Sequence, residues 1–523
     1  MIYNITIVGG GSSGWMTAAA IAYKFPEINL TLIESEKIPT IGVGESTLGF
    51  INFYMQMLDL KDDDWMPYCN ATYKNSIQFT DFYKKGSIFQ YPFGNLSTPK
   101  INLKNLDGQW MSEEPNVMYV NDFFTLKSVN PNVTPQDFVR YFNINGVLAE
   151  FNRQTLDSLD GYNFAKDTAY HFDAEMFGQF LKNKFCKNIK HVIGTVDEVN
   201  VDDGGIKSIR VNDKFYKSDL FIDCTGFKSL LIDKVDDEFI PFKNLMNDKA
   251  VVARIFYDNE EEQKKNVKNV TDCKVMNSGW IWDIPLWNRK SRGYVYSSKF
   301  IDDKTAEEEF RKETGYEGDV FFVNFKHGIR KRAWVKNVLS IGLSYGFIEP
   351  LESTGLFSTH ENIIRFLQIL KTSNKEVNLI EKQIFNNHLK LFMLDLSEFV
   401  SVHYGFSRNR HTEYWRHVTE NVDYDIDYDK YYLNTLQFMS MAFRTNSYDS
   451  PITDGGMIYI LAGMDQNFIN SERLTFSNDK VLEESFNQKI YKNFRKIINE
   501  RIEMVNKFHT SYDFLRKYVY YKE

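Results

Sequence analysis

The stretch Ile2–Glu34, which reads IYNITIVGGGSSGWMTAAAIAYKFPEINLTLIE, decides the fold of this chain. Its β-branched opening meets residues 9–14, GGGSSG, which match the pattern G-x-G-x-x-G. An alanine-rich helical pattern follows from about residue 15 to 25, and a second apolar run ends on an acid. Strand, glycine turn, helix, strand and acid in this order are typical of a dinucleotide-binding βαβ unit. The sequence therefore predicts an α/β protein with a Rossmann-like nucleotide-binding domain.

The positions of this turn have separate expected roles. Gly9 permits the tight turn, Gly11 lets the backbone approach a pyrophosphate, and Gly14 lets the helix and strand pack closely. Ser13 lies at the start of the helix, whose free N–H groups face the phosphates. Glu34 can accept hydrogen bonds from ribose hydroxyls. The motif alone does not separate FAD from NAD, and a βαβ unit without a ligand is the simpler alternative.

Two further turns favour FAD. Residues 217–226, KSDLFIDCTG, predict an apolar strand that ends in a D-x-T-G turn from Asp223 to Gly226. Flavoproteins of the p-hydroxybenzoate hydroxylase type have a similar turn, and residues 338–347, VLSIGLSYGF, resemble their second flavin-contacting turn, at Gly342. No second G-x-G-x-x-G follows a strand in the sequence. We therefore expect an FAD-binding, Rossmann-like domain of the flavoprotein monooxygenase type, with FADH2 supplied by a separate NAD(P)H flavin reductase.

Charge, cysteines and hydropathy exclude several classes. The formal charge of -8 argues against nucleic acid as a partner. The four cysteines are far apart and form no C-x-x-C, so we expect no metal site and a reducing compartment. The first residues lack the pattern of a signal peptide, and no apolar run reaches the ~18 residues of a membrane span. These features predict a cytoplasmic protein with no membrane partner.

Three motifs outside the nucleotide turn are more specific. They are WIWDIP at residues 280–285, PLESTG at residues 350–355, and DWMP followed by TYKNSIQF with Lys74 across residues 64–79. Taken singly, they read as a buried strand ending at proline, a proline-led helix start and a solvated lysine. Together they resemble the W-x-W-x-I-P, P-L-E-S-T-G and F-K-x-x-I-x-F motifs of the flavin-dependent tryptophan halogenase family, which adds a halogen to electron-rich aromatic carbons. The resemblance extends from residue 1 to about 420 and thins beyond it.

The resemblance implies catalytic roles. Lys74 matches the catalytic lysine, whose ammonium group either hydrogen-bonds hypohalous acid or reacts with it to form a haloamine. Glu352 matches the acid that accepts the ring proton as a general base. Backbone N–H groups around Ser353, Thr354 and Gly355 would hold the halide ion, chloride or bromide. Molecular oxygen (O2) is the implied co-substrate.

Other residues are implied to surround the reaction. Gly44 and Glu45 lie in GVGEST at residues 42–47, which resembles the loop that covers the flavin. Trp280 and Trp282 would flank the passage between flavin and substrate, and core packing alone is the alternative for each. Glu349 is interpreted as a supporting acid.

The substrate side differs from the tryptophan-specific pattern. Tyr91 and Phe93 lie in YPFG, where tryptophan halogenases often have H-P-F-G. The usual histidine stacks near the indole, and the family's C-terminal tryptophan clamp has no match here. We therefore predict a small indole-, phenol- or aniline-like substrate without assuming tryptophan.

The expected organisation has three parts. Residues 1–95 and 160–373 form a discontinuous FAD-binding core, residues 96–159 form a substrate-side insertion, and residues 374–523 form a mainly helical region that covers the substrate. Within the insertion we predict a helix from Thr134 to Asn152, and a homodimer is compatible with this organisation. A flavin-dependent aromatic hydroxylase is disfavoured because it would lack Lys74 and WIWDIP. A non-catalytic nucleotide-binding protein would not need those features together with Glu352.

Overall fold

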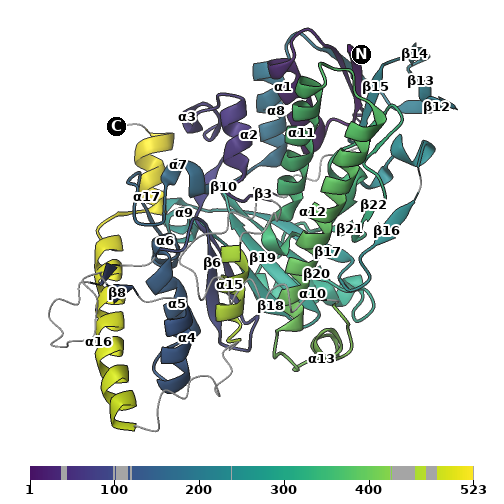
Figure 1. The fold of residues 1–523 in the computed structure, drawn as a ribbon. Coiled ribbons are helices and arrows are strands. Elements are labelled where there is room, and N and C mark those ends of the chain that lie inside the picture. Colours follow the sequence, from purple (N-terminus) through teal and green to yellow (C-terminus); the bar gives the residue numbers. More distant parts are fainter. Residues whose placement is uncertain are drawn as a thin grey trace.

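The computed structural model describes residues 1–36, 44–97, 100–101, 116–117, 120–236, 238–424, 426, 454–466 and 480–521. The nucleotide-binding sheet lies near the N-terminus, a large mixed sheet occupies the middle, and a group of helices lies at the opposite end (Figure 1). The predicted mixed α/β class with helices in the C-terminal region is confirmed.

A six-stranded sheet carries the glycine turn. Its order is β11 (Lys190–Ile193), β2 (Asn29–Glu34), β1 (Asn4–Val8), β15 (Leu220–Asp223), β24 (Val338–Ser340) and β23 (Trp334–Val335). The first five strands run parallel, and β23 is antiparallel to β24. Helix α1 (Ser12–Lys24) contacts both α8 (Ala174–Phe185) and α11 (Thr354–Thr372). Parallel strands need such cover, and the carboxyl ends of β1, β15 and β24 therefore open toward one side, where nucleotides bind.

A seven-stranded sheet carries the paired tryptophans. Its order is β21 (Phe321–Asn324), β17 (Lys249–Phe256), β20 (Arg289–Tyr296), β19 (Gly279–Pro285), β18 (Val270–Met276), β5 (Ser76–Thr80) and β6 (Ile88–Pro92). Strand β19 contains WIWDIP and is buried at six of its seven positions. The alternation expected of a one-sided sheet is therefore absent, because both faces of this strand are covered.

A small sheet joins the two large ones. Its order is β3 (Glu45–Ser46), β10 (Ala169–Phe172) and β4 (Thr72–Lys74), and both pairings are antiparallel. The central strand sets Ser46 and Thr72 on either side of His171, and Lys74 opposite Ala169. Residues that are far apart in the sequence are thus fixed beside one another by strand register.

The predicted helix from Thr134 to Asn152 is two helices. Helix α5 (Pro135–Phe142) ends at Asn143, and α6 (Ile144–Glu150) begins there. Asn143 has extended backbone angles, and its side chain accepts a hydrogen bond from the N–H of Gly146. An asparagine that caps the following helix in this way interrupts the first one.

The described parts of the insertion and of the C-terminal region share one core. Helices α4 (Val120–Val129), α5, α15 (Asp454–Gly463) and α16 (Lys480–Val505) contribute buried side chains to it, including Phe123, Phe138, Tyr141, Tyr459 and Phe494. Phe138 contacts Phe142 and Tyr459, and Tyr141 stacks on Phe494 with ring centroids 5.1 Å apart.

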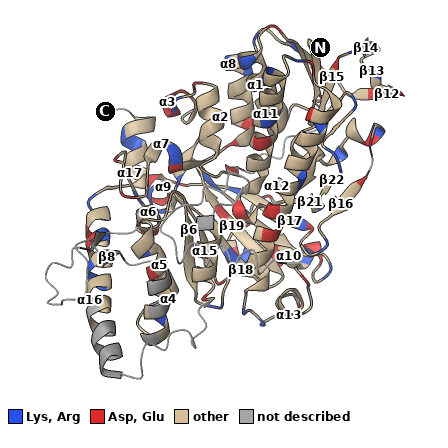
Figure 2. Ribbon diagram, viewed as in Figure 1, with Lys and Arg blue, Asp and Glu red and all other residues tan. Residues whose placement is uncertain are grey.

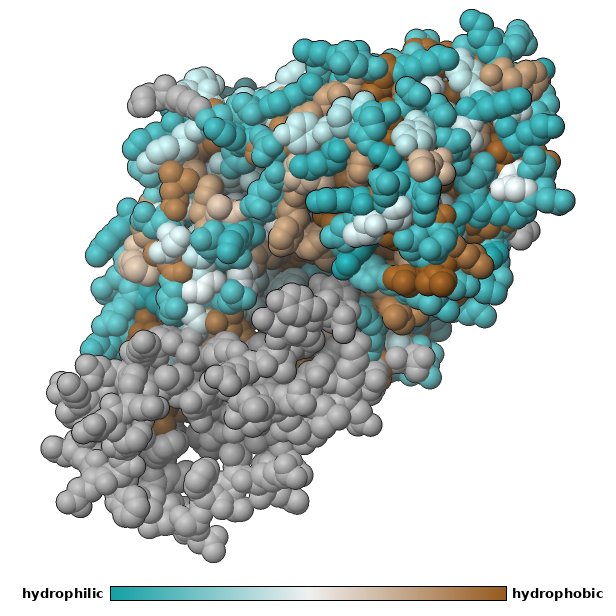
Figure 3. Space-filling model, turned by 45° about the horizontal axis from the view of Figure 1, so that its top comes forward, coloured by the Kyte–Doolittle hydropathy of each residue, from teal (hydrophilic) through white to brown (hydrophobic). Residues whose placement is uncertain are grey.

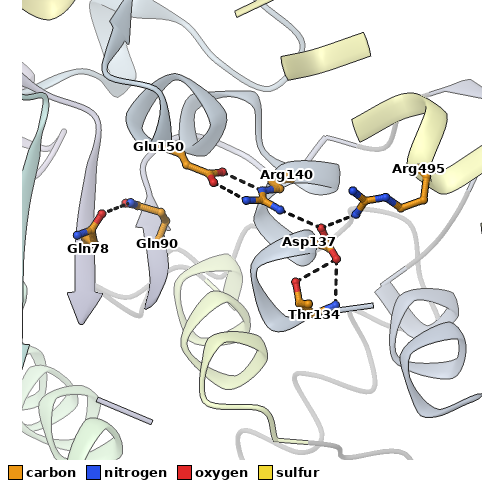
Figure 4. A network of polar contacts seen from close by, with 7 residues as sticks. All are labelled: Gln78, Gln90, Thr134, Asp137, Arg140, Glu150 and Arg495. Atoms are coloured by element: carbon orange, nitrogen blue, oxygen red, sulfur yellow. Dashed lines mark hydrogen bonds and ion pairs between the residues drawn. The ribbon is translucent and has the colours of Figure 1, made fainter. Parts of the chain in front are cut away.

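A buried carboxylate reinforces this packing (Figure 4). Asp137 is 1% exposed and accepts hydrogen bonds from Thr134 at the start of α5 and from Arg495 of α16, the latter at 2.9 Å. Arg140 contacts the same carboxylate at 3.3 Å and forms a two-point ion pair with Glu150 of α6. One side chain therefore connects a helix start with two arginines from different segments.

The remaining elements surround these units. They are α2 (Ile51–Met57), α3 (Asp62–Trp65), β7 (Lys100–Ile101), β8 (Asn116–Val117), β9 (Arg153–Gln154), α7 (Phe164–Asp167), β12 (Val196–Asp202), β13 (Gly205–Val211), β14 (Lys214–Tyr216), β16 (Phe239–Pro241), α9 (Glu260–Asn266), α10 (Asp303–Thr314), β22 (Gly328–Arg330), β25 (Gly346–Phe347), α12 (Leu379–Gly405), α13 (Glu413–Glu420), β26 (His509–Thr510) and α17 (Ser511–Leu515).

Figure 2 shows acidic and basic residues interspersed over the described ribbon. In Figure 3 hydrophilic residues cover most of the described surface on one face, with hydrophobic residues between them. Every helix among the described residues is either too short or too polar to span a lipid bilayer.

Candidate active site

The glycine turn has the shape that its sequence predicts. Gly9 has a φ of 113°, and a Cβ atom there would lie 2.2 Å from the carbonyl oxygen of Cys224. A Cβ on Gly14 would lie 1.9 Å from the carbonyl oxygen of Gly9, so both positions require glycine. A Cβ on Gly11 would meet no atom within 4 Å. Among the described residues the backbone at Gly11 therefore borders open space, which fits a pyrophosphate site.

Glu34 lies at the end of β2, above the same turn. Its carboxylate is 2.7 Å from His191 Nε2 and 3.7 Å from Lys182 Nζ. A Cβ on Gly10 would collide with this side chain, which shows how closely the acid covers the turn. The carboxylate is thus held between two basic groups beside the glycine turn.

Asp223 is engaged by its own turn. One carboxylate oxygen accepts hydrogen bonds from the Leu231 and Ile232 N–H groups at 2.7 and 2.9 Å. The other accepts from the Thr225 N–H and hydroxyl groups at 2.9 and 2.7 Å. Asp223 therefore shapes the turn, whose Gly226 has a φ of 66° and meets no atom of the described part of the chain within 4 Å of an added Cβ.

The second predicted flavin turn meets the predicted halide site. Gly342 has a φ of 73°, and a Cβ on it would lie 2.8 Å from the Ser13 side chain. A narrow cavity is lined by Gly342, Phe347, Thr354 and Gly355, among others. The Thr354 hydroxyl is buried with no hydrogen-bond partner among the described residues. Together with the open glycines of the two nucleotide turns, these features fit a bound flavin beside the start of α11.

Lys74 ends strand β4 in a fully buried position. It is 0% exposed, and its Nζ donates hydrogen bonds to the Thr47 carbonyl at 2.9 Å and to Ser353 Oγ at 2.8 Å. Its Nζ also lies 5.0 Å from the centroid of the Phe93 ring. Burial lowers the pKa of Lys74 to about 7, although Cys273 and Glu352 oppose the shift. At neutral pH the group therefore exchanges between ammonium and amine.

Glu352 ends the short helix η4 (Pro350–Glu352) and faces His403 of α12. The carboxylate is 1% exposed, and its Oε1 lies 2.7 Å from His403 Nε2. His403 Nδ1 lies 3.0 Å from the Phe399 carbonyl, which only accepts, so Nδ1 carries a proton. Two bare acceptors would repel at this separation, so a second proton lies between Glu352 and His403.

Burial raises the pKa of Glu352, while His403 and Lys74 oppose the shift. The site thus pairs a lysine whose pKa is lowered with an acid whose pKa is raised. Such opposite shifts are the arrangement that acid–base chemistry near neutral pH needs.

Ser353 follows Glu352 in the chain and contacts Lys74. It occupies the N-cap position of α11 with a φ of 57°, and its hydroxyl lies between Lys74 and Ser46. The side chain makes no capping hydrogen bond to the helix. The left-handed backbone at Ser353 instead turns the chain so that the N–H groups of Thr354 and Gly355 begin the helix.

Trp280 is fixed by Glu349, which sequence reasoning treated only as a supporting acid. The indole Nε1 donates to Glu349 Oε2 at 2.9 Å. Asn247 and Tyr404 donate to the same oxygen at 2.7 and 2.9 Å. Trp282 lies 6.1 Å from the Trp280 ring and covers Gly293, where any Cβ would collide with the indole. Each tryptophan is therefore oriented as well as buried.

Two of the four predicted substrate-side residues, Tyr91 and Phe93, lie in one aromatic group. Tyr91 contacts Phe93, Phe399 and Tyr459, with ring centroids 5.8 to 6.3 Å apart. Because Phe93 also contacts Lys74, this group borders the lysine. The sequence around Tyr459 contains no motif that would identify it as a site residue, since α15 follows a stretch without recognisable motifs.

Of the predicted flavin-covering loop, residues 42–47, the structure describes residues 44–47. Gly42 and Val43 lie outside the described residues. Gly44 has a φ of 91°, and burial raises the pKa of Glu45 to about 7, with Asp173 adding to the shift. His403 was missed as a site residue, although the sequence HY at the end of a buried helical pattern was a usable signal.

Comparison with known proteins agrees with this site. The family model described as tryptophan halogenase matches residues 4–446. Tryptophan 6-halogenase SttH of Streptomyces toxytricini is 32% identical over 430 residues, covering 79% of this chain and 80% of that protein. Tryptophan 7-halogenase RebH of Lentzea aerocolonigenes is 31% identical over 441 residues, covering 79% and 78%.

Solved structures give the same result. The apo structure of VirX1 has a TM-score of 0.85 at 38% identity and covers 99% of this chain and 100% of that one. The crystal structure of SttH has a TM-score of 0.78 at 28% identity and covers 98% and 99%.

This fold matches solved structures of flavin-dependent halogenases, and it brings the buried Lys74 against Ser353 at the start of α11. The chain belongs to the tryptophan halogenase family. It is therefore an enzyme that uses a flavin and a halide to halogenate an aromatic substrate, and the hydroxylase alternative is not favoured.

Proposed function

We propose that this enzyme uses FADH2, O2 and chloride or bromide to halogenate a freely diffusing, electron-rich arene. Lys74 and Glu352 carry the chemistry in this proposal, and a separate NAD(P)H flavin reductase supplies FADH2. The sequence holds no second dinucleotide turn that would bind a pyridine nucleotide. Bound FADH2 would supply two electrons to O2, which would oxidise the halide, so that FADH2, O2, halide and one proton give FAD, hypohalous acid and water.

The burial of Lys74 beside Ser353 and Glu352 carries this proposal. The ammonium group is positioned to donate a hydrogen bond to the oxygen of hypohalous acid, which makes the halogen more electrophilic. The ring carbon then bonds to the halogen as the O–X bond breaks, and the leaving hydroxide takes a proton from the Lys74 ammonium group and departs as water. Glu352 accepts the ring proton as a general base. Overall, ArH and HOX give ArX and H2O.

Other residues have supporting roles in the proposal. The N–H groups of Thr354 and Gly355 would hold the halide, because free N–H groups at a helix start favour anions. Gly9, Gly11, Ser13, Gly14, Glu34, Gly44, Glu45, Asp223, Gly226 and Gly342 would surround the FAD. Trp280 and Trp282 would separate the organic substrate from the flavin, since Trp280 is hydrogen-bonded to Glu349 and Trp282 fits over Gly293, where a larger residue would displace it.

The aromatic group around Tyr91 supports an arene as substrate. Indoles, phenols and anilines are flat and electron-rich, which suits both stacking on these rings and attack on an electrophilic halogen. Tyr91 and Phe399 offer no charged group that would recognise the ammonium or carboxylate of an amino acid. Tryptophan is therefore one candidate among several.

One assay tests the proposal. Purified enzyme, FAD, NADH and an unrelated flavin reductase are incubated with chloride or bromide and a panel of indoles, phenols and anilines. Mass spectrometry should show products that gain one halogen in place of one hydrogen and that are absent without halide. Products that gain only oxygen would instead support the hydroxylase alternative.

A further inference from the structure

Lys74 begins a chain of hydrogen bonds that leads away from the reaction site. Its Nζ donates to Ser353 Oγ at 2.8 Å, and Ser353 Oγ donates to Ser46 Oγ at 3.0 Å. Ser46 Oγ lies 2.6 Å from Thr271 Oγ1. Three hydroxyl groups, from η4/α11, β3 and β18, therefore follow one another without a gap.

The chain continues through a histidine. Thr271 Oγ1 lies 2.9 Å from His171 Nε2, and His171 Nδ1 lies 3.0 Å from Thr72 Oγ1. Thr72 Oγ1 then donates to the carbonyl oxygen of Pro285 at 2.6 Å. His171 is buried, and so are the residues that carry the nearest three hydroxyl groups of this hydrogen-bonded chain, Thr72, Thr271 and Ser46.

The direction of every hydrogen bond is fixed from the far end. The Pro285 carbonyl only accepts, so it takes the single proton of the Thr72 hydroxyl. Thr72 Oγ1 must then accept from His171, and Nδ1 carries the proton. Burial and the nearby Lys74 lower the pKa of His171 well below its ordinary value, so the ring is neutral and Nε2 is a bare acceptor.

The hydroxyl groups follow in turn. Thr271 must donate to His171 Nε2, so its oxygen accepts from Ser46. Ser46 has then used its proton, and its oxygen accepts from Ser353. Ser353 Oγ is therefore left with lone pairs that face Lys74 and no proton that could point at it. Hydrogen bonds aligned in one direction polarise one another, which makes this oxygen a stronger acceptor.

We propose that His171, Thr271 and Ser46 form a one-way hydrogen-bonded chain that positions Ser353 and Lys74 for halogenation. His171 is a positioning residue here, and its neutral ring sets the direction in which each hydroxyl points. This inference rests on the proposed function only in assigning the reaction that Lys74 serves. The alignment of Lys74 itself follows from the contacts.

The groups that face Lys74 define what the chain contributes. Cys273 and Glu352 both favour the ammonium form of Lys74, the ring of His171 is neutral, and burial raises the pKa of the Cys273 thiol while Lys74 opposes that shift. The Phe93 ring adds a cation–π contact. Burial disfavours the ammonium form of Lys74, and the aligned acceptor at Ser353 favours it. Breaking the chain should therefore lower the pKa of Lys74 further.

Thr271 offers a matched pair of variants. Thr271→Val keeps the shape of the side chain and removes the hydroxyl, whereas Thr271→Ser keeps the hydroxyl and removes a methyl group. The pKa of Lys74 is measured in flavin-free protein by NMR of 15N-lysine-labelled samples, with the signal assigned through Lys74→Arg. Halogenation is measured in the complete reductase-coupled assay, and folding is checked by thermal unfolding and FAD binding.

We expect Thr271→Val to lower the pKa of Lys74 by about half a unit or more and to slow halogenation about 10-fold. Thr271→Ser should keep the halogenation rate within about twofold of the parent rate and the pKa of Lys74 within about a few tenths of a unit of the parent value. An unchanged Lys74 pKa in a folded Thr271→Val protein would overturn the chain. If Thr271→Val shifted the pKa of Lys74 but the parent enzyme halogenated no compound of the panel, the hydrogen-bonded chain would be supported and the proposed function would be rejected.

Discussion

A buried lysine amine is the central feature at the scale of single residues. Because Lys74 has no exposure and two hydrogen-bond acceptors among the described residues, its ammonium form is held by a small set of contacts. Losing a group that acts in proton transfer or polarisation commonly costs ~10²–10⁴ in rate. We expect Lys74→Ala to lose halogenation by at least this factor while FAD binding persists. The reductase-coupled assay and a flavin titration measure the two properties, and near-normal halogenation would refute the role of Lys74.

The same lysine should make stability depend on pH. Its pKa is about 7 in the folded protein against an ordinary 10.5, so between these values the unfolded chain holds a proton that the folded chain has released. Stability then rises with pH, by at most about 1.4 kcal/mol per unit. The Lys74→Met variant should lack this contribution to the pH dependence of the free energy of unfolding.

The comparison is made by urea unfolding of flavin-free protein at several pH values from 6.5 to 9.5. Any stability advantage of Lys74→Met over the parent should shrink as the pH rises through this window. Parallel curves for the two proteins would show that Lys74 titrates at an ordinary pKa.

Glu352 titrates in the opposite sense. A general base must be ionised, and burial raises the pKa of Glu352 above its ordinary 4.5. Halogenation should therefore fall as the pH drops toward that raised value. Glu352→Gln keeps the shape, removes the base, and should slow turnover ~10²–10⁴-fold with no remaining acid limb from this group. A Gln variant with the parent rate at all pH values would remove Glu352 from the mechanism.

At the scale of elements, Asp137 is the junction between the insertion and α16. It is almost fully buried and serves a helix start and two arginines. Removing it leaves Arg140, Arg495 and the Thr134 N–H with fewer partners, so Asp137→Ala should cost about 3 kcal/mol of stability. Arg495 is one-third exposed, so Arg495→Met should cost less than about 1 kcal/mol. Equal losses in urea unfolding would show that Asp137 is not the junction.

The elements also show how far sequence reasoning reaches. The βαβ unit was predictable because its strand, turn and helix are local, and the structure places β1, α1 and β2 within a few residues of the expected limits. The break at Asn143 was not, because the apolar pattern continues through it and only the cap of the next helix interrupts it.

Contacts between distant segments were the hardest to predict. Lys74, Glu352 and Trp280 carry motif signals, but His171 and Tyr459 become candidate site residues only through packing. His171 is set between Ser46 and Thr72 by strand register, and no local pattern encodes that register. A sequence therefore identifies reacting groups more readily than the residues that orient them.

At the scale of the whole molecule, the substrate is set by reactivity as well as by fit. Electrophilic halogenation requires an electron-rich ring, so indoles, phenols and anilines should react and nitroarenes should not. Tyr91, Phe399 and Tyr459 provide apolar contact area, and this aromatic group holds no charged side chain that would fix an amino-acid backbone.

We therefore expect the halogen to enter where each ring is intrinsically most reactive, and simple indoles to react at least as fast as tryptophan. Bromide should be used more readily than chloride, since bromide is the easier halide to oxidise. Product regiochemistry on tryptophan and on simple indoles, measured by mass spectrometry and NMR under each halide, provides the comparison. If tryptophan were chlorinated at a single unactivated ring carbon while simple indoles stayed inert, the site would have to grip the amino-acid backbone. The recognition groups would then have to come from residues other than the aromatic group around Tyr91.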